Sequence, residues 1–236
     1  MCTLSWIRRL DGYHVFFNRD ERRTRAPGLA PEHHERGGVH WLAPRDAESQ
    51  GTWIGANDRG LALAILNRWH ESPIATEGPW TSRGLLVRDL LDAPSIAAVK
   101  HRLEGADLSV YQPFTLAAFE PGLDLSVFAW NGRAPVLDQV PDTGLVLTSS
   151  GYDQEAALRR ADQFARYSDP SPDQFEAVHA SHQPVRGPLS VCMHRPEAET
   201  VSYTRIDVNP VRIVMGYVPG PPGETTERVT SALDAA

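Results

Sequence analysis

The chain has 236 residues, of which 41% are hydrophobic and 22% charged, so it can bury a core without disulfide bonds. Its formal net charge of −7 argues against a nucleic-acid-binding protein, because such proteins normally carry a basic excess. No apolar run approaches the ~20 residues of a membrane-spanning helix, and Arg8 and Arg9 interrupt the place where a signal peptide is apolar.

The first third of the chain is typical of β-structure. Five short strands are predicted there, over Cys2–Ile7, Tyr13–Phe17, Trp41–Ala43, Thr52–Ala56 and Leu61–Leu66. Turns at 10–12 and 57–60 contain Asp and Gly and would close two hairpins, while the polar segment 18–38 predicts a long loop.

Helices and strands alternate in the rest of the chain. Four helices are predicted, over Arg83–Leu91, Ser95–Leu103, Asp153–Tyr167 and Pro172–His182. Ser82 is a candidate N-cap of the first helix, and Gly105 a candidate C-cap of the second. The remaining strands are expected over Phe114–Phe119, Leu123–Trp130, Gly144–Leu147, Leu189–Met193, Thr200–Ile206 and Val211–Tyr217.

The order of elements is strands, two helices, strands, two helices, strands. This order favours the α+β class, with two packed antiparallel sheets and helices on the outside. No linker-like composition divides the chain, so we expect a single domain over residues 1–218. The Pro- and Gly-rich start of residues 219–236, followed by polar residues, predicts a flexible C-terminal tail.

Two cysteines are too few for a secreted disulfide scaffold, so we expect a cytoplasmic protein that does not insert stably into a membrane. Cys2 directly follows Met1, and a small second residue allows methionine aminopeptidase to remove the initiator. The mature chain would then begin with cysteine; the sequence leaves open whether this happens. Cys192 lies in an apolar run and is expected to be a buried, inert thiol.

An amino-terminal cysteine carries a nucleophile and a base on one residue. The α-amine has a pKa of ~7.7–8.0 and the thiol of ~8.5, so the amine can take up the thiol proton near neutral pH. Antiparallel pairing across the first hairpin would bring Arg19 and Asp20 beside Cys2, where a cation favours the thiolate and a carboxylate holds the amine. Taken alone, a cysteine at position 2 is most often a small residue tolerated near a frayed end, and a segment such as 18–21 is most often a charged turn.

Four ordered motifs make the chain similar to a known family. Met1-Cys2-Thr3 is followed by Phe17-Asn18-Arg19-Asp20-Glu21, then by Gly51-Thr52-Trp53-Ile54-Gly55 with Asn57, Gly60 and Asn67, and then by Arg83-Gly84-Leu85. This pattern resembles the NRDE family, also called the transport and Golgi organisation protein 2 family. That family is in turn similar to the choloylglycine hydrolase and penicillin V acylase branch of the N-terminal nucleophile (Ntn) hydrolases.

The resemblance implies a four-layer αββα sandwich and an Ntn-type amidohydrolase. It implies that Cys2 is the nucleophile, Arg19 the cation that stabilises the thiolate, Asp20 the partner of the amine and Asn67 the oxyanion donor. The implied activity is that of a hydrolase or acyltransferase acting on a small amide through a Cys2 thioester, with no cofactor or metal.

The chain departs from the acylase pattern in one place. Where those acylases have a further active-site asparagine, after the strand at 146–148, this chain has Ser149 and Ser150. A serine hydroxyl can donate a hydrogen bond, but its reach is shorter than that of asparagine. The acylases also use a late arginine, for which Arg186 is the nearest candidate in the sequence.

A second function of a different class stays open. The NRDE family has been linked to haem movement and to lipid metabolism, so the same pocket could bind or carry haem or an acyl lipid without turnover. On either hypothesis the partner is a small-molecule substrate or ligand, and the oligomeric state is left open. His33, His34 and His40 lie in a polar segment without a second ligand cluster, which argues against zinc there.

Overall fold

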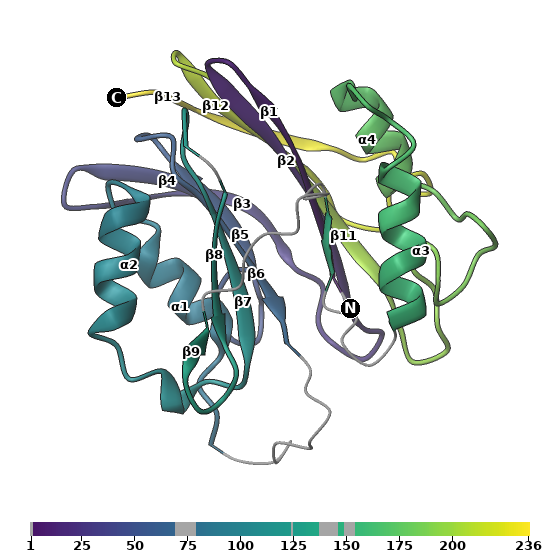
Figure 1. The fold of residues 1–236 in the computed structure, drawn as a ribbon, viewed down its shortest axis with the longest axis horizontal. Helices are drawn as coiled ribbons and strands as arrows, with labels where there is room; N and C mark the ends of the chain where they lie inside the picture. The colour runs from purple at the N-terminus through teal and green to yellow at the C-terminus, as the bar shows by residue number, and fades with distance from the viewer. Residues whose placement is uncertain (1, 69–78, 124, 137–145, 149–153) are drawn as a thin grey trace.

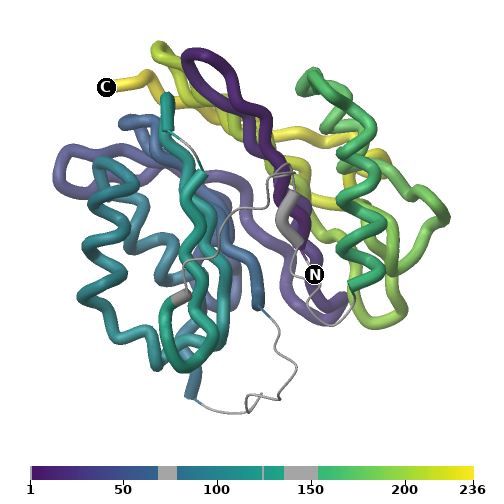
Figure 2. Tube along the Cα trace, in the orientation of Figure 1, coloured from purple at the N-terminus to yellow at the C-terminus, as the bar shows by residue number. Residues whose placement is uncertain are grey.

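The computed structural model describes residues 2–68, 79–123, 125–136, 146–148 and 154–236. Sheet 1 is antiparallel and has the spatial order β10-β1-β2-β11-β12-β13. Its strands, in that order, are Val146–Thr148, Thr3–Arg9, Gly12–Arg22, Ala198–Val208, Arg212–Val218 and Val229–Asp234. The first hairpin therefore lies within sheet 1 and pairs with a strand from the far end of the chain (Figure 2).

Sheet 2 is also antiparallel and follows chain order from β3 to β9. Its strands are Leu29–Arg36, Val39–Arg45, Ile54–Asn57, Ala62–Asn67, Phe114–Phe119, Ser126–Trp130 and Pro135–Val136. The two sheets pack face to face. Helices α1 (Arg83–Leu90) and α2 (Ile96–Glu104) cover the outer face of sheet 2, and α3 (Gln154–Phe164) and α4 (Pro172–His179) cover that of sheet 1 (Figure 1). A short 3-10 turn, Leu108–Val110, follows α2. The architecture is the four-layer αββα sandwich expected for the α+β class.

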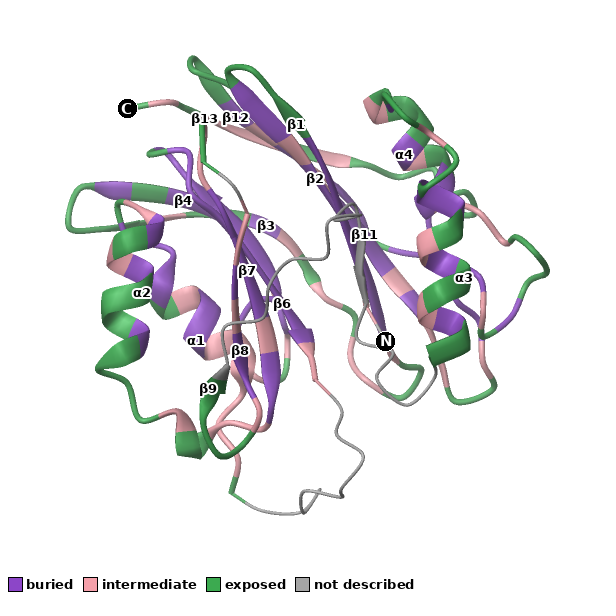
Figure 3. Ribbon diagram, in the orientation of Figure 1, coloured by how far each residue is buried: buried purple, intermediate pink, exposed green. Residues whose placement is uncertain are grey.

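The central strands of each sheet are buried on both faces, which explains why they are almost continuously apolar. In β2, Val15 and Phe17 pack into the core between the sheets, whereas Phe16 packs against α3 and α4. Side chains of a strand alternate between its two faces, so each face receives its own apolar set. The helices are buried only on the side facing their sheet (Figure 3).

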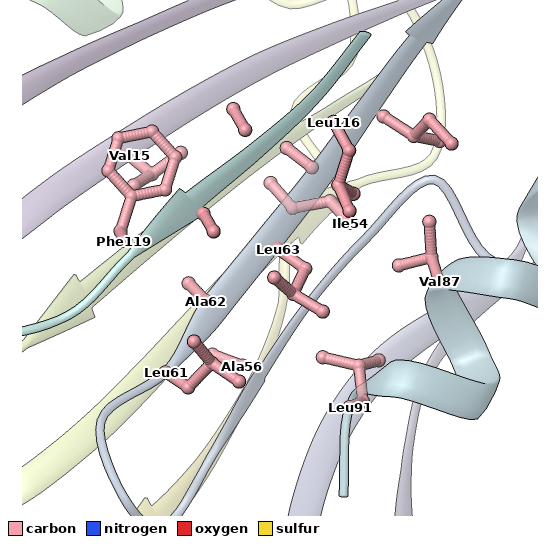
Figure 4. Packing of buried hydrophobic residues seen from close by; sticks show 14 of the residues in the cluster. Val15, Ile54, Ala56, Leu61, Ala62, Leu63, Val87, Leu91, Leu116 and Phe119 are labelled. Atoms are coloured by element: carbon pink, nitrogen blue, oxygen red, sulfur yellow. The ribbon is translucent and has the colours of Figure 1, made fainter. Parts of the chain in front are cut away.

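Helix α1 packs closely against the outer face of sheet 2. Val87 and Leu91 point towards the sheet on the side where Leu63 lies (Figure 4). Gly55 pairs with Leu63 on that face, and a Cβ there would lie 2.5 Å from Cδ1 of Leu91. Ser82 caps α1 by accepting a hydrogen bond from the Gly84 N–H, as predicted.

The structure differs from the predicted elements in its edge strands. The predicted loop 18–38 is wrong, because β2 continues to Arg22 and β3 covers half of the remainder. Strand β3 lies at the edge of sheet 2 and has a register shift around Pro31, where the missing N–H of proline interrupts the ladder. Its outward residues are polar, so the sequence lacks a strand signal.

Two further segments differ. Residues 189–193 are a loop rather than the predicted strand, because Ser190 bonds locally to the carbonyl groups of Gly187 and Cys192. Within the segment 219–236, predicted as a flexible tail, β13 pairs with β12 along six residues, and Leu233 packs against the core between the sheets. Among the residues that the structure describes, no helix is long and apolar enough to span a bilayer.

Candidate active site

The first hairpin brings the start of the chain beside the end of β2. Thr3 pairs with Asn18, so the register places Cys2 alongside Arg19. The Cys2 thiol lies 3.8 Å from the backbone oxygen of Asp20, and its side chain is partly exposed. The predicted juxtaposition of Cys2 with this strand end is thus present in the fold.

The Asp20 carboxylate is fully buried and held from several sides. The hydroxyl of Thr200, on β11, donates to Asp20 Oδ1 at 2.6 Å, and Arg160 donates to Oδ2 at 3.4 Å. Burial raises the pKa of Asp20, whereas the positive charges of the amino terminus and of Arg160 oppose the increase. Burial dominates, so the net pKa of Asp20 is raised. The role of Asp20 as partner of the amine stays a prediction.

Arg160 is the arginine that approaches this site, and sequence reasoning missed it. It projects from α3 into sheet 1, where its side chain is fully buried. Besides Asp20, it donates to Thr3 Oγ1 at 2.9 Å and to the Pro188 carbonyl at 3.3 Å. In the sequence, Arg160 stands on the apolar stripe of a predicted helix. Pattern analysis nevertheless places an arginine on the solvent side of a helix, so its burial was not predicted.

Arg19 points to the opposite face of β2, between the sheets. Its guanidinium lies 4.2 Å from the centre of the Trp53 ring and pairs with Asp46 at 2.5 Å. Burial would raise the pKa of Asp46, but hydrogen bonds from Arg25 and from the Ser49 N–H, with the charge of Arg19, hold it well below its usual range. Asp46 stays ionised and fixes the Arg19 side chain beside Cys2.

The electrostatic surroundings of Cys2 contain opposing charges. Burial and the negative charge of Asp20 raise the pKa of the Cys2 thiol, while the amino-terminal charge and Arg19 lower it, so that the net pKa is raised. The thiol is therefore protonated near neutral pH and needs a base before it can attack a carbonyl carbon.

A second arginine, at the start of helix α1, is within electrostatic reach of Cys2. Arg83, the first residue of α1, is partly buried and donates to the Pro113 carbonyl at 2.8 Å. Burial lowers the pKa of Arg83, and the negative charges that Cys2 and Glu21 can carry offset part of this decrease. Arg83 is thus close enough to sense a thiolate at Cys2. Its place in the third sequence motif was a signal for this position.

The structure places the predicted oxyanion donor Asn67 at the end of a strand. Asn67 ends β6, pairs in register with Phe114 on β7 and is partly buried. Its role as an oxyanion donor stays a prediction. Ser149 and Ser150 lie outside the described residues, although β10 immediately before them pairs with β1 through Thr148 and Thr3.

Buried polar side chains support the strand that carries the site. Asn18 donates to the carbonyl groups of His179 and Val191, and its own oxygen lies 3.0 Å from His179 Nδ1. His179 Nε2 lies 2.7 Å from the Ser5 hydroxyl on β1. These contacts fix the first hairpin against α4.

His179 makes the fold sensitive to acid. Burial, followed by the charge of Arg160, lowers the pKa of His179 from 6.5 to about 3, so the unfolded chain takes up this proton first. The stability due to neutral His179 is complete above pH 6.5 and is lost as the pH falls towards 3, by about 1.4 kcal/mol per pH unit.

Urea unfolding of wild type and His179→Gln at pH 7 and pH 5 measures this contribution. The wild type is expected to lose about 2 kcal/mol more than the variant between the two pH values. Equal losses in the two proteins would show that His179 does not control the acid response.

The other sequence candidates lie around a separate group of side chains. Cys192 is buried, as expected, and burial with the charge of Asp20 raises its pKa to about 12. Arg186 donates to Glu224 and lies 3.3 Å from His194 Nδ1. It therefore belongs to the surroundings of Cys192, and Arg160 occupies the position near Asp20.

Solved structures with this fold are N-terminal nucleophile hydrolases. A Caenorhabditis elegans N-acylethanolamine-hydrolyzing acid amidase ortholog is 11% identical, with a TM-score of 0.58 over 87% of this chain and 91% of that chain. A variant of conjugated bile acid hydrolase from Clostridium perfringens is 14% identical, with a TM-score of 0.58 over 99% and 92% of the two chains. No curated protein sequence matches the chain.

The sequence motifs and the fold point to the same relation. The family described as Transport and Golgi organisation 2 matches residues 1–178, a stretch that includes Cys2, the strand end at Asp20, Arg83 and Arg160. The chain belongs to the Transport and Golgi organisation 2 (NRDE) family and has the αββα fold of the N-terminal nucleophile hydrolases.

Proposed function

We propose that the protein is an N-terminal cysteine hydrolase or acyltransferase that acts on a small amide through a Cys2 thioester. The observation that carries this proposal is the position of the partly exposed Cys2 thiol, 3.8 Å from the Asp20 backbone at the end of the neighbouring strand. The hydrolase fold supports the reaction class, and the amide substrate is drawn by analogy from the amidase that shares the fold.

The proposed reaction requires removal of Met1, so that the α-amine belongs to Cys2. The free amine takes the thiol proton, and the sulfur attacks the amide carbonyl carbon. The C–N bond then breaks, the amine leaving group takes the proton back, and a thioester remains on Cys2. Water attacks the thioester, which releases a carboxylic acid and restores the thiol; in an acyltransferase a second amine replaces water.

The charged residues have distinct roles in this proposal. The Asp20 carboxylate, fixed by Thr200 and Arg160, holds the ammonium form of the amine between its two proton transfers. Arg19 and Arg83 stabilise negative charge on sulfur from two sides. Asn67 donates to the developing oxyanion.

Intact-mass spectrometry of the purified chain tests the proposal. Mature protein is expected to lack Met1 and, after incubation with a panel of N-acylethanolamines and acid quenching, to gain the mass of one acyl group on the amino-terminal peptide. Chain that retains Met1, produced without methionine aminopeptidase, is the matched control and should gain none. Retention of Met1 in the native protein, or acylation elsewhere only, would contradict the mechanism.

A cavity that none of the candidate site residues lines supports binding of an acyl chain as a second candidate function, at a place other than the expected Cys2 pocket. It has a volume of about 200 Å³, and its apolar lining includes Leu103, Leu108, Phe114 and Phe128, next to α2. A carrier would bind a fatty acid equally well in wild type and Cys2→Ala without releasing product. Turnover by the wild type alone would favour the enzyme.

A further inference from the structure

The loop between α4 and β11 gathers three metal-binding side chain types away from Cys2. His182, Cys192 and His194 each offer one ligand atom, and these atoms all lie within 4.8 Å of one another. Nε2 of His182 lies 3.0 Å from Nε2 of His194, and Cys192 Sγ lies 3.9 Å from the same His194 atom. In the part of the chain that the structure describes, this is the one such group of three.

The distances match the edges of a tetrahedral zinc site. Zinc binds imidazole nitrogen at ~2.0–2.1 Å and thiolate sulfur at ~2.3 Å, which places two nitrogens about 3.3 Å apart and nitrogen and sulfur about 3.6 Å apart. The observed separations of 3.0 and 3.9 Å differ from these edges by only a few tenths of an ångström. Two of the three edges therefore already have lengths close to those of a zinc site, and the third, between His182 and Cys192, is at most 4.8 Å.

A carboxylate lies beside the two histidines. Oε1 of Glu224 lies 3.1 Å from His182 Nε2 and 3.3 Å from His194 Nε2. A carboxylate oxygen bound at ~2.0–2.2 Å would lie about 3.4 Å from each nitrogen, so these two separations fit a tetrahedron. Glu224 is not in the group whose ligand atoms all lie within 4.8 Å of one another, so its side chain has to turn towards Cys192 to become the fourth ligand. The side chains of His182 and Glu224 are 31% and 35% exposed, which gives an ion a path from solvent.

The surroundings fix the inner ligands. The backbone N–H of Cys192 donates to the Ser181 carbonyl, and that of His194 to the Gly187 carbonyl. Nδ1 of His194 lies 3.3 Å from Nη2 of Arg186, which can only donate, and 3.7 Å from Oε2 of Glu199. When Nε2 binds a metal, the proton moves to Nδ1 and faces the Glu199 carboxylate. Arg186, which also approaches Nδ1, retains Glu224 as its partner.

We propose that His182, Cys192 and His194, with Glu224 as fourth ligand, form a structural zinc site. On binding, the Cys192 thiol releases its proton to solvent and a Zn–S bond forms, while the imidazoles bind as neutral Nε2 donors. This proposal does not depend on the proposed hydrolase function.

A zinc ion bound here would also restrict the movement of the Asp20 carboxylate in the candidate active site. Met193, between Cys192 and His194, donates its backbone N–H to the Thr200 hydroxyl at 2.8 Å, and that hydroxyl donates to Asp20. An ion that fixes residues on both sides of Met193 therefore fixes Thr200 as well. We expect bound zinc to protect the amide protons around Thr200 from exchange.

Cobalt(II) titration of the chelator-treated full chain tests the site. Cobalt replaces zinc in tetrahedral sites and shows a near-ultraviolet charge-transfer band when a thiolate binds it. Wild type should bind one equivalent and show this band, and zinc should displace the cobalt. An amino-terminal cysteine can chelate a metal through its own nitrogen and sulfur, so the titration is repeated with Cys2→Ser.

The variants separate the possible outcomes. Cys2→Ser and the exposed-histidine control His101→Gln should keep both the band and the affinity. Cys192→Ser should lose the band, and His182→Gln or Glu224→Gln should bind about 10-fold or more weakly. Circular dichroism shows that each variant is folded, and Glu224→Gln tests the site even where Cys192→Ser does not fold. Absence of uptake by wild type, or a band lost in Cys2→Ser and kept in Cys192→Ser, would overturn the proposal.

Discussion

Cys2→Ala is expected to lower kcat by about 10³-fold or more on any amide that the wild type hydrolyses, because the nucleophile is removed. Alanine also permits removal of Met1, so the α-amine remains at the same position in the variant. The comparison therefore separates the loss of sulfur from the loss of processing. Steady-state kinetics on the best substrate of the acyl panel gives the measurement.

Cys2→Ser is the companion variant. It keeps an attacking atom and the amine base, but a hydroxyl is far harder to ionise than a thiol. Its kcat should fall between those of the wild type and Cys2→Ala, with unfolding free energies within about 1 kcal/mol for all three proteins. Full turnover by folded Cys2→Ala would exclude the thioester mechanism.

Arg160→Met is expected to lower the free energy of unfolding by about 3–5 kcal/mol, the usual cost of removing one partner from a buried ion pair. Arg160 and Asp20 are both fully buried, and the substitution leaves the Asp20 charge without its nearest guanidinium. Urea denaturation at pH 7 measures the loss.

The neighbouring Arg159 is the matched control. It lies on the same helix, is more than half exposed and, among the described residues, forms its ion pair with Glu155 one turn away. Arg159→Met should change stability by about 0.5 kcal/mol or less. The double variant Arg160→Met/Asp20→Asn should recover part of the loss, because it removes the stranded charge. Equal stability of Arg159→Met and Arg160→Met would rule out a structural role for the buried pair.

The local features of the fold could be predicted from the sequence. The first hairpin, the N-cap at Ser82 and the helix pairs depend on residues close together in the chain, and all are present. The edge strands β3 and β13 were missed, because an edge strand exposes one face and its polar residues are typical of loops.

The candidate site was predictable only where one hairpin creates it. Cys2, Arg19 and Asp20 meet through the register of β1 and β2, which the turn sets. Arg160 and Thr200 reach Asp20 from elements 140 and 180 residues away, and only the packing of α3 and β11 against β2 brings them there. No local pattern marks a buried arginine as the partner of a distant carboxylate.

Strand β11 has consequences for how the length of this family's chains can vary. Its register against β2 shifts between Thr200 and Ser202, so one residue there is extra. Removing that residue would leave Thr200 opposite Asp20, but it would take away the local kink that the extra residue gives β11, and with it the aim of the Thr200 hydroxyl at the Asp20 carboxylate. Hairpin turns such as the one at Asp11 can gain or lose residues at little cost, whereas this irregular step tolerates neither.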